Sequence, residues 1–585
     1  MFYKKLKFLP ILFIFLISLV ACKDPSTSSS QVNSYTSLTT TSSSISSSNT
    51  NSSVVTSYTK DENGFYILED DYFKNYSKDD GLQTSKIRFA EYIPEELKYK
   101  QMKLFVGDKE IPLFNCKTNM SQTWSGEAPS RMNNSVAVFE LQGKVTLKLQ
   151  CSFALLDECT IRPLEANISP ILDDNRRVIT FEISSTGQYT IELRSNRVLH
   201  LFVNDYKEFD EYKNNENVIY FGPGVHNKDN SKYINQYNRI NLSSNQTVFV
   251  DLGAIVHAGF SANNSSNIKI VGSGIIDGSI FDRSVERNTT LIPYDFNYCN
   301  NIEIKGIITT DPAGWCYNMY FCNDVILDNI KIISSRSNGD GVSIQSCQRV
   351  DVTNSFIRSW DDSLVVKNYP HWSNKNNQGL TNDIYFGDCI LWTDLAQSME
   401  VGFETIGKTM ENITFENITV LHNFHKPVIS IHNGNNADLK NVVFKNITVE
   451  DASLGRGDGN NIFIEITTEF SATWSTKHTT TELGSIDGVT ISNVLVIDGR
   501  DDLKVSIRGS IDTRKGYNNT EHYVSNVTIS NVLIKDTLLD ESYKDLFKYM
   551  TNNLVFDNNS NKITGSDIKY NDSSMYGSSY IVETL

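Results

Sequence analysis

Three aspartates in the middle of the chain have the residue type and the spacing of a shared acid–base site. Asp340 lies in the run SNGDG, and the pair Asp361 and Asp362 lies in WDDS, 21 and 22 residues further on. Carboxyl groups that share a site raise one another's pKa, because like charges oppose a second ionisation. A protonated carboxyl beside ionised ones is what glycosidic cleavage needs, with one group protonating the leaving oxygen and another activating water.

The same aspartates also have an ordinary explanation. Asp before Gly, or an Asp pair after Trp, is common in turns whose side chains are solvated. The choice between one shared site and three separate turns depends on how the chain between Asp340 and Asp362 folds.

A repeated strand pattern runs through the second half of the chain. Its units are 23 and 25 residues apart at first and longer later on. Strands at such a period, without helical patterns between them, predict a solenoid of β coils, which an array of β-sandwiches explains less well. We therefore predict an all-β fold with a parallel β-helix over residues 206–540. The units begin at Asn301, Asp324, Arg349, Asp383, Asn412, Asn441, Gly488 and Asn526.

Two sets of residues at fixed positions in the units support this prediction. Six asparagines are expected to form hydrogen-bonded ladders along the coils, as identical side chains do in stacked strands. Three cysteines share another position, and the sequence leaves open whether they are buried thiols or form a disulfide. The sets are Asn329, Asn354, Asn417, Asn446, Asn493 and Asn531, and Cys299, Cys322 and Cys347.

The coil register places the aspartates on neighbouring coils. Val342 lies over Leu364 with both side chains inward, as do Ile344 and Val366, so Asp340 lies over Asp362 at roughly 4.8 Å. The same register predicts two outward rows, in which we expect no arginine. One row holds Lys367, Gly402 and His432, and the other holds Val365, Glu400 and Ser430.

The start of the chain has the features of an export signal. Lysines are followed by an apolar run, residues 8–20, that is too short to span a membrane. Residues 1–21 are therefore predicted to be a signal peptide. Cys22 directly after Leu-Val-Ala resembles the bacterial lipobox, which implies lipidation of Cys22 and a location on the extracellular face of the cell membrane. An ordinary signal peptide with an incidental cysteine is the alternative.

Three further segments are expected around the helix. Residues 22–60 are rich in Ser and Thr and predict a flexible tether. Residues 61–205 contain short alternating strands, such as Val178 to Ile183, which predict an antiparallel β-sandwich in which Cys151 and Cys159 could pair. Residues 541–585 are polar and are expected to be a cap or a tail.

The charge of the chain limits the classes of partner that it is expected to bind. The net charge of −16 is spread along the sequence. This balance favours a soluble exported protein and argues against nucleic acid or a polyanion as the main partner. The cysteines show no C-x-x-C pairs of the zinc type, and we predict no cofactor and no metal.

Three motifs together resemble a known group of enzymes. GSGIIDG at 272–278, SNGDGVSIQSC and DDSLVVK resemble the right-handed parallel β-helix glycoside hydrolases of the polygalacturonase and dextranase type, families 28 and 49, with the pectin-lyase-like fold. The resemblance covers about residues 216–533. It implies that Asp361 is the general acid and that Asp340 and Asp362 orient the attacking water, with inversion. Inverting enzymes need carboxyls further apart than one coil spacing, which requires the Asp361 side chain to point away from its neighbour.

The sequence departs from the polygalacturonases at two places. Their G-H-G is replaced by Ala396-Gln397-Ser398, and their R-x-K falls near Ser430-Ile431-His432. A uronate site needs fixed cations, so these changes favour a neutral sugar. The W-x-D-x-x-Q arrangement from Trp392 and the preceding sandwich are more similar to the dextranase side.

Several residues are predicted to bind substrate because they lie on the outward rows or next to the aspartates. Each also has a structural alternative, such as core packing for Trp360, a solvated Lys367 and a structural role for His432. Tyr369 and Trp372 are further candidates for stacking on sugars. The predicted substrate-binding residues are Trp360, Lys367, Gln397, Glu400 and His432.

The predicted function is an extracellular inverting glycoside hydrolase that acts on a polysaccharide. One alternative is a β-helix polysaccharide lyase, which commonly uses Ca²⁺ held by acidic residues and an Arg or Lys base. Another is a non-catalytic carbohydrate-binding surface lipoprotein, because solenoids also serve as scaffolds.

Overall fold

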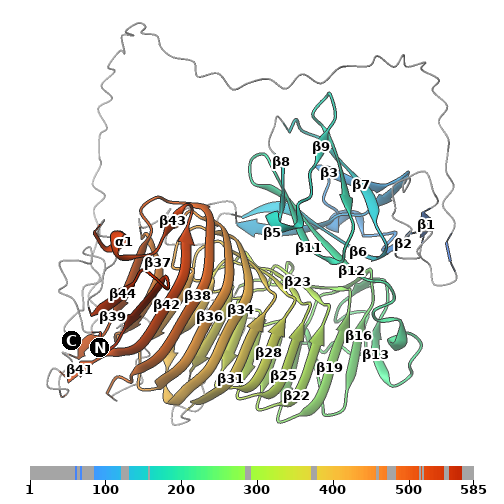
Figure 1. Ribbon diagram of the computed structural model, residues 1–585. Coiled ribbons are helices and arrows are strands. Elements are labelled where there is room, and N and C mark those ends of the chain that lie inside the picture. The colour runs from blue at the N-terminus through green and yellow to red at the C-terminus, as the bar shows by residue number, and fades with distance from the viewer. Residues whose placement is uncertain are drawn as a thin grey trace, which may run out of the picture. The chain divides into compact units, whose positions relative to one another are not determined.

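A computed structural model of the chain describes twelve stretches (Figure 1). The predicted signal peptide, Cys22, most of the predicted tether and Trp372 lie outside them. Residues 55–585 form one compact unit. The described residues are 60–61, 66–68, 85–119, 131–155, 159–283, 291–369, 379–455, 460–470, 482–512, 516, 520–545 and 553–568.

The first part of this unit is a β-sandwich, as predicted. Its core lies between two sheets and contains Leu104, Phe139 and Ile191. Cys151 and Cys159 are free thiols. In sheet order, one sheet holds β1 (Tyr66–Leu68), β2 (Ser85–Phe89), β6 (Arg131–Gln142), β12 (Arg197–Asp205), β11 (Gly187–Leu193) and β8 (Cys159–Arg162), with β5 (Phe114–Asn119) on β6. The other holds β4 (Lys109–Ile111), β3 (Met102–Val106), β7 (Val145–Cys151), β10 (Val178–Ile183) and β9 (Ile171–Leu172).

The rest of the unit is the predicted parallel β-helix. Figure 1 shows its successive strands, such as β19, β22, β25 and β28, lying side by side along the solenoid. One long sheet holds, in chain order, β13 (Val218–Phe221), β14 (Gly224–His226), β16 (Thr247–Val250), β17 (Ala254–Val256), β19 (Ser266–Gly272), β20 (Ile275–Asp277), β22 (Asn300–Lys305), β23 (Ile308–Thr310), β25 (Asn323–Asp328), β26 (Lys331–Ile333), β28 (Gln348–Thr353), β29 (Phe356–Ser359), β31 (Gly379–Gly387), β32 (Ile390–Thr393), β34 (Gly407–Asn423), β36 (Asp438–Ala452), β38 (Ile486–Gly499) and β42 (Val524–Ile534).

A second parallel sheet, here called the site sheet, completes each coil. Its strands are β15 (Arg239–Asn241), β18 (Gly259–Asn263), β21 (Tyr294–Asn297), β24 (Tyr317–Tyr320), β27 (Val342–Gln345), β30 (Leu364–Asn368), β33 (Met399–Thr405), β35 (Ile429–Asn433), β37 (Ile462–Thr468) and β39 (Lys504–Arg508). Val342 pairs with Leu364 and Ile344 with Val366, and all four are buried in the core. The predicted register is therefore confirmed.

The last coil is followed by antiparallel strands. β43 (Thr537–Leu538) and β45 (Lys562–Gly565) pair with β42, and β44 (Leu554–Asp557) pairs with β45. This pairing covers the edge that the solenoid would otherwise expose. Nearby are β40 (Ser510–Asp512), β41 (Thr520–His522) and the short helix α1 (Glu541–Asp545). Within the described stretches, no helix has the length and apolar character needed to cross a membrane.

Asparagine ladders run along the coils, as predicted for four of the six residues. Asn531 donates to Asn493, Asn493 to Asn446, Asn446 to Asn417, and Asn417 to Asp388, at 3.0–3.2 Å. All four have left-handed backbones, which asparagine tolerates better than most residues. The other two have different partners. Asn329 donates to Asn204 of the sandwich (3.3 Å), and Asn354 donates to Asp328 (2.8 Å).

The stacked cysteines are buried free thiols rather than a disulfide. Cys299, Cys322 and Cys347 are all free, and none of the three is exposed to solvent. The backbone N–H of Cys322 lies 3.3 Å from the sulfur of Cys347. Thiol Sγ atoms, such as that of Cys347, donate to backbone carbonyls within the core.

The sandwich contacts the β-helix through partly buried ion pairs. Arg162 lies 2.6 Å from Glu450, and His422 lies between Glu192 (2.7 Å) and Asp451 (2.8 Å). Burial opposes the charge of His422, but its two carboxylate partners raise the pKa of the imidazole above its ordinary value. Oppositely charged residues of the sandwich and of the β-helix are therefore paired where the two parts meet.

The ladder predicts a graded loss of stability. Asn446→Gly keeps the left-handed backbone but removes the side-chain hydrogen bonds, which should cost about 1 kcal/mol. Asn446→Ala should cost about 1–2 kcal/mol more, because Ala is strained in that conformation. Thermal unfolding should therefore give apparent Tm values in the order wild type, Gly, Ala. An equal Tm for all three proteins would contradict a supporting role for the ladder.

Candidate active site

The aspartate trio (Asp340, Asp361 and Asp362) lies where the chain enters two neighbouring strands of the site sheet. The backbone N–H of Gly341 donates to the Asp362 carbonyl (2.8 Å), and that of Cys316 donates to the Asp340 carbonyl (3.0 Å). Asp340 and Asp362 therefore stack on adjacent coils, as the register predicted. Trp315 and Gln397 extend this column by one coil on either side.

A chain of hydroxyl groups holds the turn that carries Asp361 and Asp362. The Ser359 hydroxyl donates to the Asp361 carbonyl (2.6 Å) and lies 2.7 Å from the Ser363 hydroxyl. The Ser363 hydroxyl in turn lies 2.7 Å from that of Thr393 on the next coil. Because these hydroxyls are buried, the turn is fixed to the core rather than free in solvent.

Lys367 lies at the centre of the carboxylates. Its Nζ is 3.6 Å from Asp340 Oδ2, 3.7 Å from Asp362 Oδ2 and 3.6 Å from Glu404 Oε2. It also lies 5.5 Å from the centre of the Trp315 ring. We call Lys367 with Asp340, Asp362 and Glu404 the lysine-centred cluster. One ammonium group thus stands among three carboxylates, beside the turn that carries Asp361.

The environment favours protonated carboxyl groups in the trio. Burial, followed by the charge of Asp361, raises the pKa of Asp340 to about 7, against the opposing charge of Lys367. Burial also raises the pKa of Asp361, and it raises the pKa of Asp362 well above its ordinary value. Burial opposes the charge on Lys367, but the carboxylates, with Glu404 foremost, hold its pKa well above the ordinary value. Carboxyl groups of the trio can therefore remain protonated near neutral pH, while Lys367 beside them stays charged.

Glu404 was not predicted from the sequence, because β33 contains a bulge. Val366 pairs with Val401, but Asn368 pairs with Thr405, so two extra residues stand opposite Lys367. The prediction that Lys367 and Gly402 share one row is therefore wrong, although Gly402 pairs with His432 as expected. The bulge needs Gly402, since its φ is +134° and a Cβ there would lie 2.1 Å from the His432 carbonyl oxygen.

The aromatic residue beside the lysine-centred cluster is Trp315 rather than Trp360. Trp360 is only 8% exposed, which leaves little ring surface for stacking on a sugar. Trp315 is partly exposed and stands one coil before Asp340 in the same column. Extending the column back by one repeat of 25 residues would have found it in the sequence.

Glu400 and His432 lie on the outward face but are part of a buried chain of charges. His432 Nδ1 is 2.8 Å from Glu400 Oε1, and its Nε2 is 3.2 Å from Glu465 Oε2. Although burial opposes the charge, these carboxylates raise the pKa of His432 to about 10. Arg508, in the same row, lies 3.3 Å from Glu465 and also pairs with Glu469. The prediction that the outward rows hold no arginine is therefore wrong.

Gln397 and Arg283 complete the surroundings of the trio. The backbone N–H of Gln397 lies 3.4 Å from Asp362 Oδ1, and its side chain is 9% exposed. Arg283 is exposed and donates a hydrogen bond to Asn338, in the loop that carries Asp340. Its charge contributes to lowering the pKa of Asp361, against the larger effect of burial.

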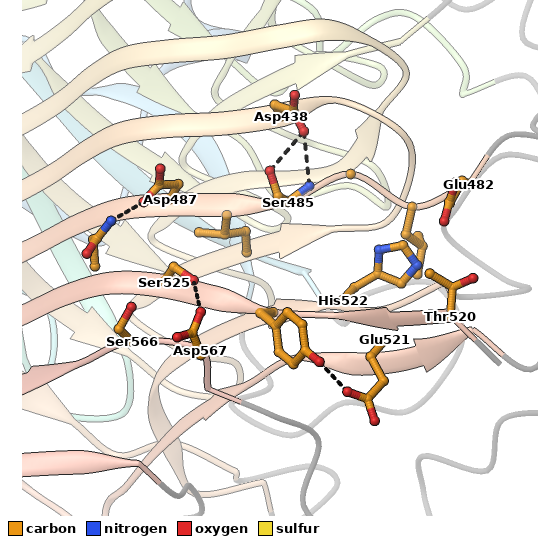
Figure 2. A pocket seen from close by; sticks show the side chains of 15 residues that line it. Asp438, Glu482, Ser485, Asp487, Thr520, Glu521, His522, Ser525, Ser566 and Asp567 are labelled. Carbon is orange, nitrogen blue, oxygen red and sulfur yellow. Dashed lines mark hydrogen bonds between the residues drawn. The ribbon is translucent and has the colours of Figure 1, made fainter.

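A separate acidic pocket of about 550 Å³ lies at the C-terminal coils (Figure 2). Ser485 donates to Asp438 (2.8 Å), Asn526 to Asp487 (2.6 Å), and Tyr523 to Glu521. These carboxylates are bound to neighbouring polar groups, and the residues that line the pocket include neither Lys367 nor the trio. The pocket is therefore distinct from the candidate active site.

Comparisons with known proteins bear on the predicted activity. Residues 228–384, which include the trio and Lys367, match the family model "Glycosyl hydrolases family 28". A polygalacturonase of Brassica napus is 26% identical over 110 residues, which is 18% of this chain. The match spans 28% of the relative's length. Both matches support the prediction of a glycosidase.

A solved structure has the same fold. Dex49A from Penicillium minioluteum matches with a TM-score of 0.55 at 13% identity, over 81% of this chain and 96% of Dex49A. The family 28 exopolygalacturonase of Yersinia enterocolitica matches with a TM-score of 0.32 at 11% identity, over 77% and 90% of the two chains. The likeness to Dex49A confirms the predicted fold class over most of the chain.

The raised pKa of Asp340 predicts how stability depends on pH. An unfolded Asp titrates near 4, and the folded group titrates at about 7. Between these values the folded state binds more protons, so stability falls as pH rises. Asp340→Asn abolishes this loss of stability, because Asn does not titrate. The Tm of the variant relative to wild type should therefore increase between pH 4 and pH 7 in thermal scans.

The exposed Asp351, on the neighbouring strand β28, provides the matched control. Asp351→Asn should follow the wild-type dependence of Tm on pH. A constant Tm difference between Asp340→Asn and wild type across this range would contradict the raised pKa.

Proposed function

We propose that the protein is an extracellular glycoside hydrolase that cleaves O-glycosidic bonds of a polysaccharide by inverting acid–base catalysis. The lysine-centred cluster beside Asp361 is the observation that carries the proposal. It provides protonated and ionised carboxyl groups side by side, which this reaction needs. The family 28 match covers the trio and Lys367 but not Glu404.

Each member of the trio has a role in the proposed reaction. Asp361 donates its proton to the glycosidic oxygen as the bond to the anomeric carbon breaks. Asp340 and Asp362 orient a water molecule, and whichever of the two is ionised takes its proton as the water attacks that carbon from the opposite face. Lys367 stabilises the negative charge on Asp340 and Asp362. Inversion follows because water attacks once, without a covalent intermediate.

The charge of the site favours a neutral sugar. Four carboxyl groups, those of the trio and Glu404, face Lys367, with Arg283 nearby. His432, a second cation on the outward face, already lies between Glu400 and Glu465. A uronate carboxylate would therefore meet an excess of negative charge, whereas the hydroxyls of a neutral sugar can donate to it.

The predicted substrate-binding residues divide into two groups. Lys367 and Gln397 lie beside the trio, and we propose that they contact the sugar. Glu400 and His432 are 1% and 3% exposed and bind each other, so we propose that they support the sheet behind the substrate. Trp360 is proposed to pack under the catalytic turn.

The position of Lys367 favours a hydrolase over a lyase. Its ammonium group stands among the carboxylates that would have to hold Ca²⁺ in a lyase. Arg508, a possible base, is bound to Glu465 and Glu469. A hydrolase uses the trio as acid and base and needs no cation in that position.

Asp361→Asn should reduce hydrolysis by about 10²–10⁴-fold, because it removes the proton donor. Binding of the polysaccharide should be retained, since Asn has the same shape. We would test wild type on dextran, other neutral polysaccharides and polygalacturonate, measuring reducing ends and following the product anomer by NMR. Asp351→Asn is the matched control and should stay fully active.

Three results would contradict the proposal. Full activity of Asp361→Asn would show that Asp361 is not the general acid. Unsaturated products that disappear with a chelator would indicate a lyase. Cleavage of polygalacturonate alone would overturn the preference for a neutral sugar.

We also propose that the protein is anchored to the extracellular face of the membrane by a lipid on Cys22. The support is the run Leu-Val-Ala-Cys after the apolar segment. Cys22→Ser should abolish incorporation of labelled palmitate into the protein. When expressing cells are fractionated, the variant should no longer be found with the membranes. Unchanged labelling would show that the lipid is elsewhere or absent.

A further inference from the structure

Two aromatic residues occupy an unusual backbone position beside the site sheet. Tyr298 and Phe321 follow directly after β21 and β24, with left-handed φ values of 56° and 51°. They belong to one column of turn residues, whose other members are Asn264 and Ser346, at φ 49° and 55°. In this column each backbone N–H donates to the next coil, as from Tyr298 to the Tyr320 carbonyl (2.9 Å).

A left-handed backbone disfavours a bulky side chain. Asn tolerates it, as at Asn264, but an aromatic residue there is an outlier. Strain of this kind persists mostly where function requires it. Core packing does not account for Tyr298, because 38% of this residue is exposed.

The two rings form one surface. The Tyr298 and Phe321 rings stack with their centres 5.4 Å apart and 27° between their planes. Tyr320, which is buried beneath, packs edge-on against both, at 5.5 Å from Tyr298 and 4.7 Å from Phe321. Since Phe321 is also partly exposed, the pair presents ring surface at the end of the strands.

Between these rings and Trp315 lies a floor of polar side chains. Gln345 donates to Asn318, and Asn318 donates to Asp295 (2.9 Å). Asn297 also donates to Asp295 (3.0 Å). These side chains point outward from β21, β24 and β27. They occupy two outward rows, one with Asp295 and Asn318 and one with Asn297 and Gln345. The second row continues to Lys367, because Gln345 pairs with Lys367 in the sheet.

The sheet has a different outward face on the other side of the trio. There Glu400, His432, Glu465 and Arg508 bind one another and are each at most 3% exposed. Polar groups are hydrogen-bonded on both sides of the trio, and Asn318 and Gln345 are each 2% exposed. The N-terminal part differs because Asp295 and Asn297 are partly exposed and lie next to exposed aromatic rings.

We propose that the outward face of β21 and β24, between Trp315 and the Tyr298–Phe321 pair, binds sugar units of the polysaccharide on the N-terminal side of the cleavage point. Pyranose rings stack their C–H faces on the aromatic rings, and their hydroxyls bind the partly exposed Asp295 and Asn297, which Asn318 supports from below. The inference rests on the proposed function, because it takes the trio as the cleavage point.

The test replaces both aromatic residues by Asn, the residue found in the same column at Asn264. In the Asp361→Asn background, Tyr298→Asn with Phe321→Asn should weaken binding about tenfold, measured by affinity electrophoresis in gels that contain dextran or the other neutral polysaccharides of the panel. In the active background, KM for the cleaved polymer should rise similarly with little change in kcat. The Tm should stay equal or rise, because Asn relieves the strain.

The exposed Ile326, on β25 of the long sheet, provides the control. Ile326→Asn should leave binding unchanged. Unchanged binding of the double variant, or a lowered Tm with normal KM, would overturn the proposal, since it would mean that the rings serve only stability. Failure of Asp361→Asn to bind any neutral polysaccharide would also overturn it. Absence of hydrolysis by wild type, with binding that depends on Tyr298 and Phe321, would refute the catalytic function but support the binding site.

Discussion

The backbone hydrogen bonds between successive coils determine which side chains become neighbours on the surface and in the core. Parallel pairing places Val342 on Leu364 and continues to Met399 on the next coil, so inward residues meet inward residues throughout. The same bonds bring outward residues into rows and columns. Asp340 and the pair Asp361-Asp362, which lie 21 residues apart in the sequence, thereby become neighbours, and burial raises their pKa values. Repetition of the core is thus what concentrates charge on one face.

This concentration of charge has to be balanced within the fold. Lys367 provides the balance beside the trio, and a hydroxyl chain from Ser359 to Thr393 fixes the turn. Behind that turn, Arg358 stacks on Trp392 (3.9 Å) and lies 3.3 Å from His200 of the sandwich. Burial holds the pKa of His200 well below its ordinary value, so the ring is neutral and its Nε2 can accept from Arg358. The sandwich therefore supports the strand that leads into the turn with Asp361 and Asp362.

Sequence reasoning found what depends on the period of the chain. The β-helix, the inward positions of Val342 and Leu364 and the stacking of Asp340 on Asp362 all follow from repeats of similar length. It failed where the period breaks. Glu404 lies in a bulge, and no repeat predicts which residue a bulge turns toward Lys367. Arg508 lies several coils away, after insertions that hide the row in the sequence.

Side-chain partners were harder to predict than positions. His432 was placed on the outward face, but only the structure shows both of its ring nitrogens facing carboxylates. Trp360 was chosen because it precedes the aspartate pair, yet its ring is buried. The backbone period fixes the direction of a side chain, whereas exposure depends on loops of variable length that cover the face.

The bulge in β33 also affects how such a protein can evolve. The two additional residues stand on the outward side, while Val401 and Thr405 keep their pairing with the previous coil. The bulge therefore brings an acidic group to the site while the pairing on either side of it is kept. In a solenoid, gain or loss of one or two codons at a strand end can change the chemistry of a single coil and leave its neighbours intact. Variation in length, as well as substitution, is then a route by which related proteins acquire new substrates.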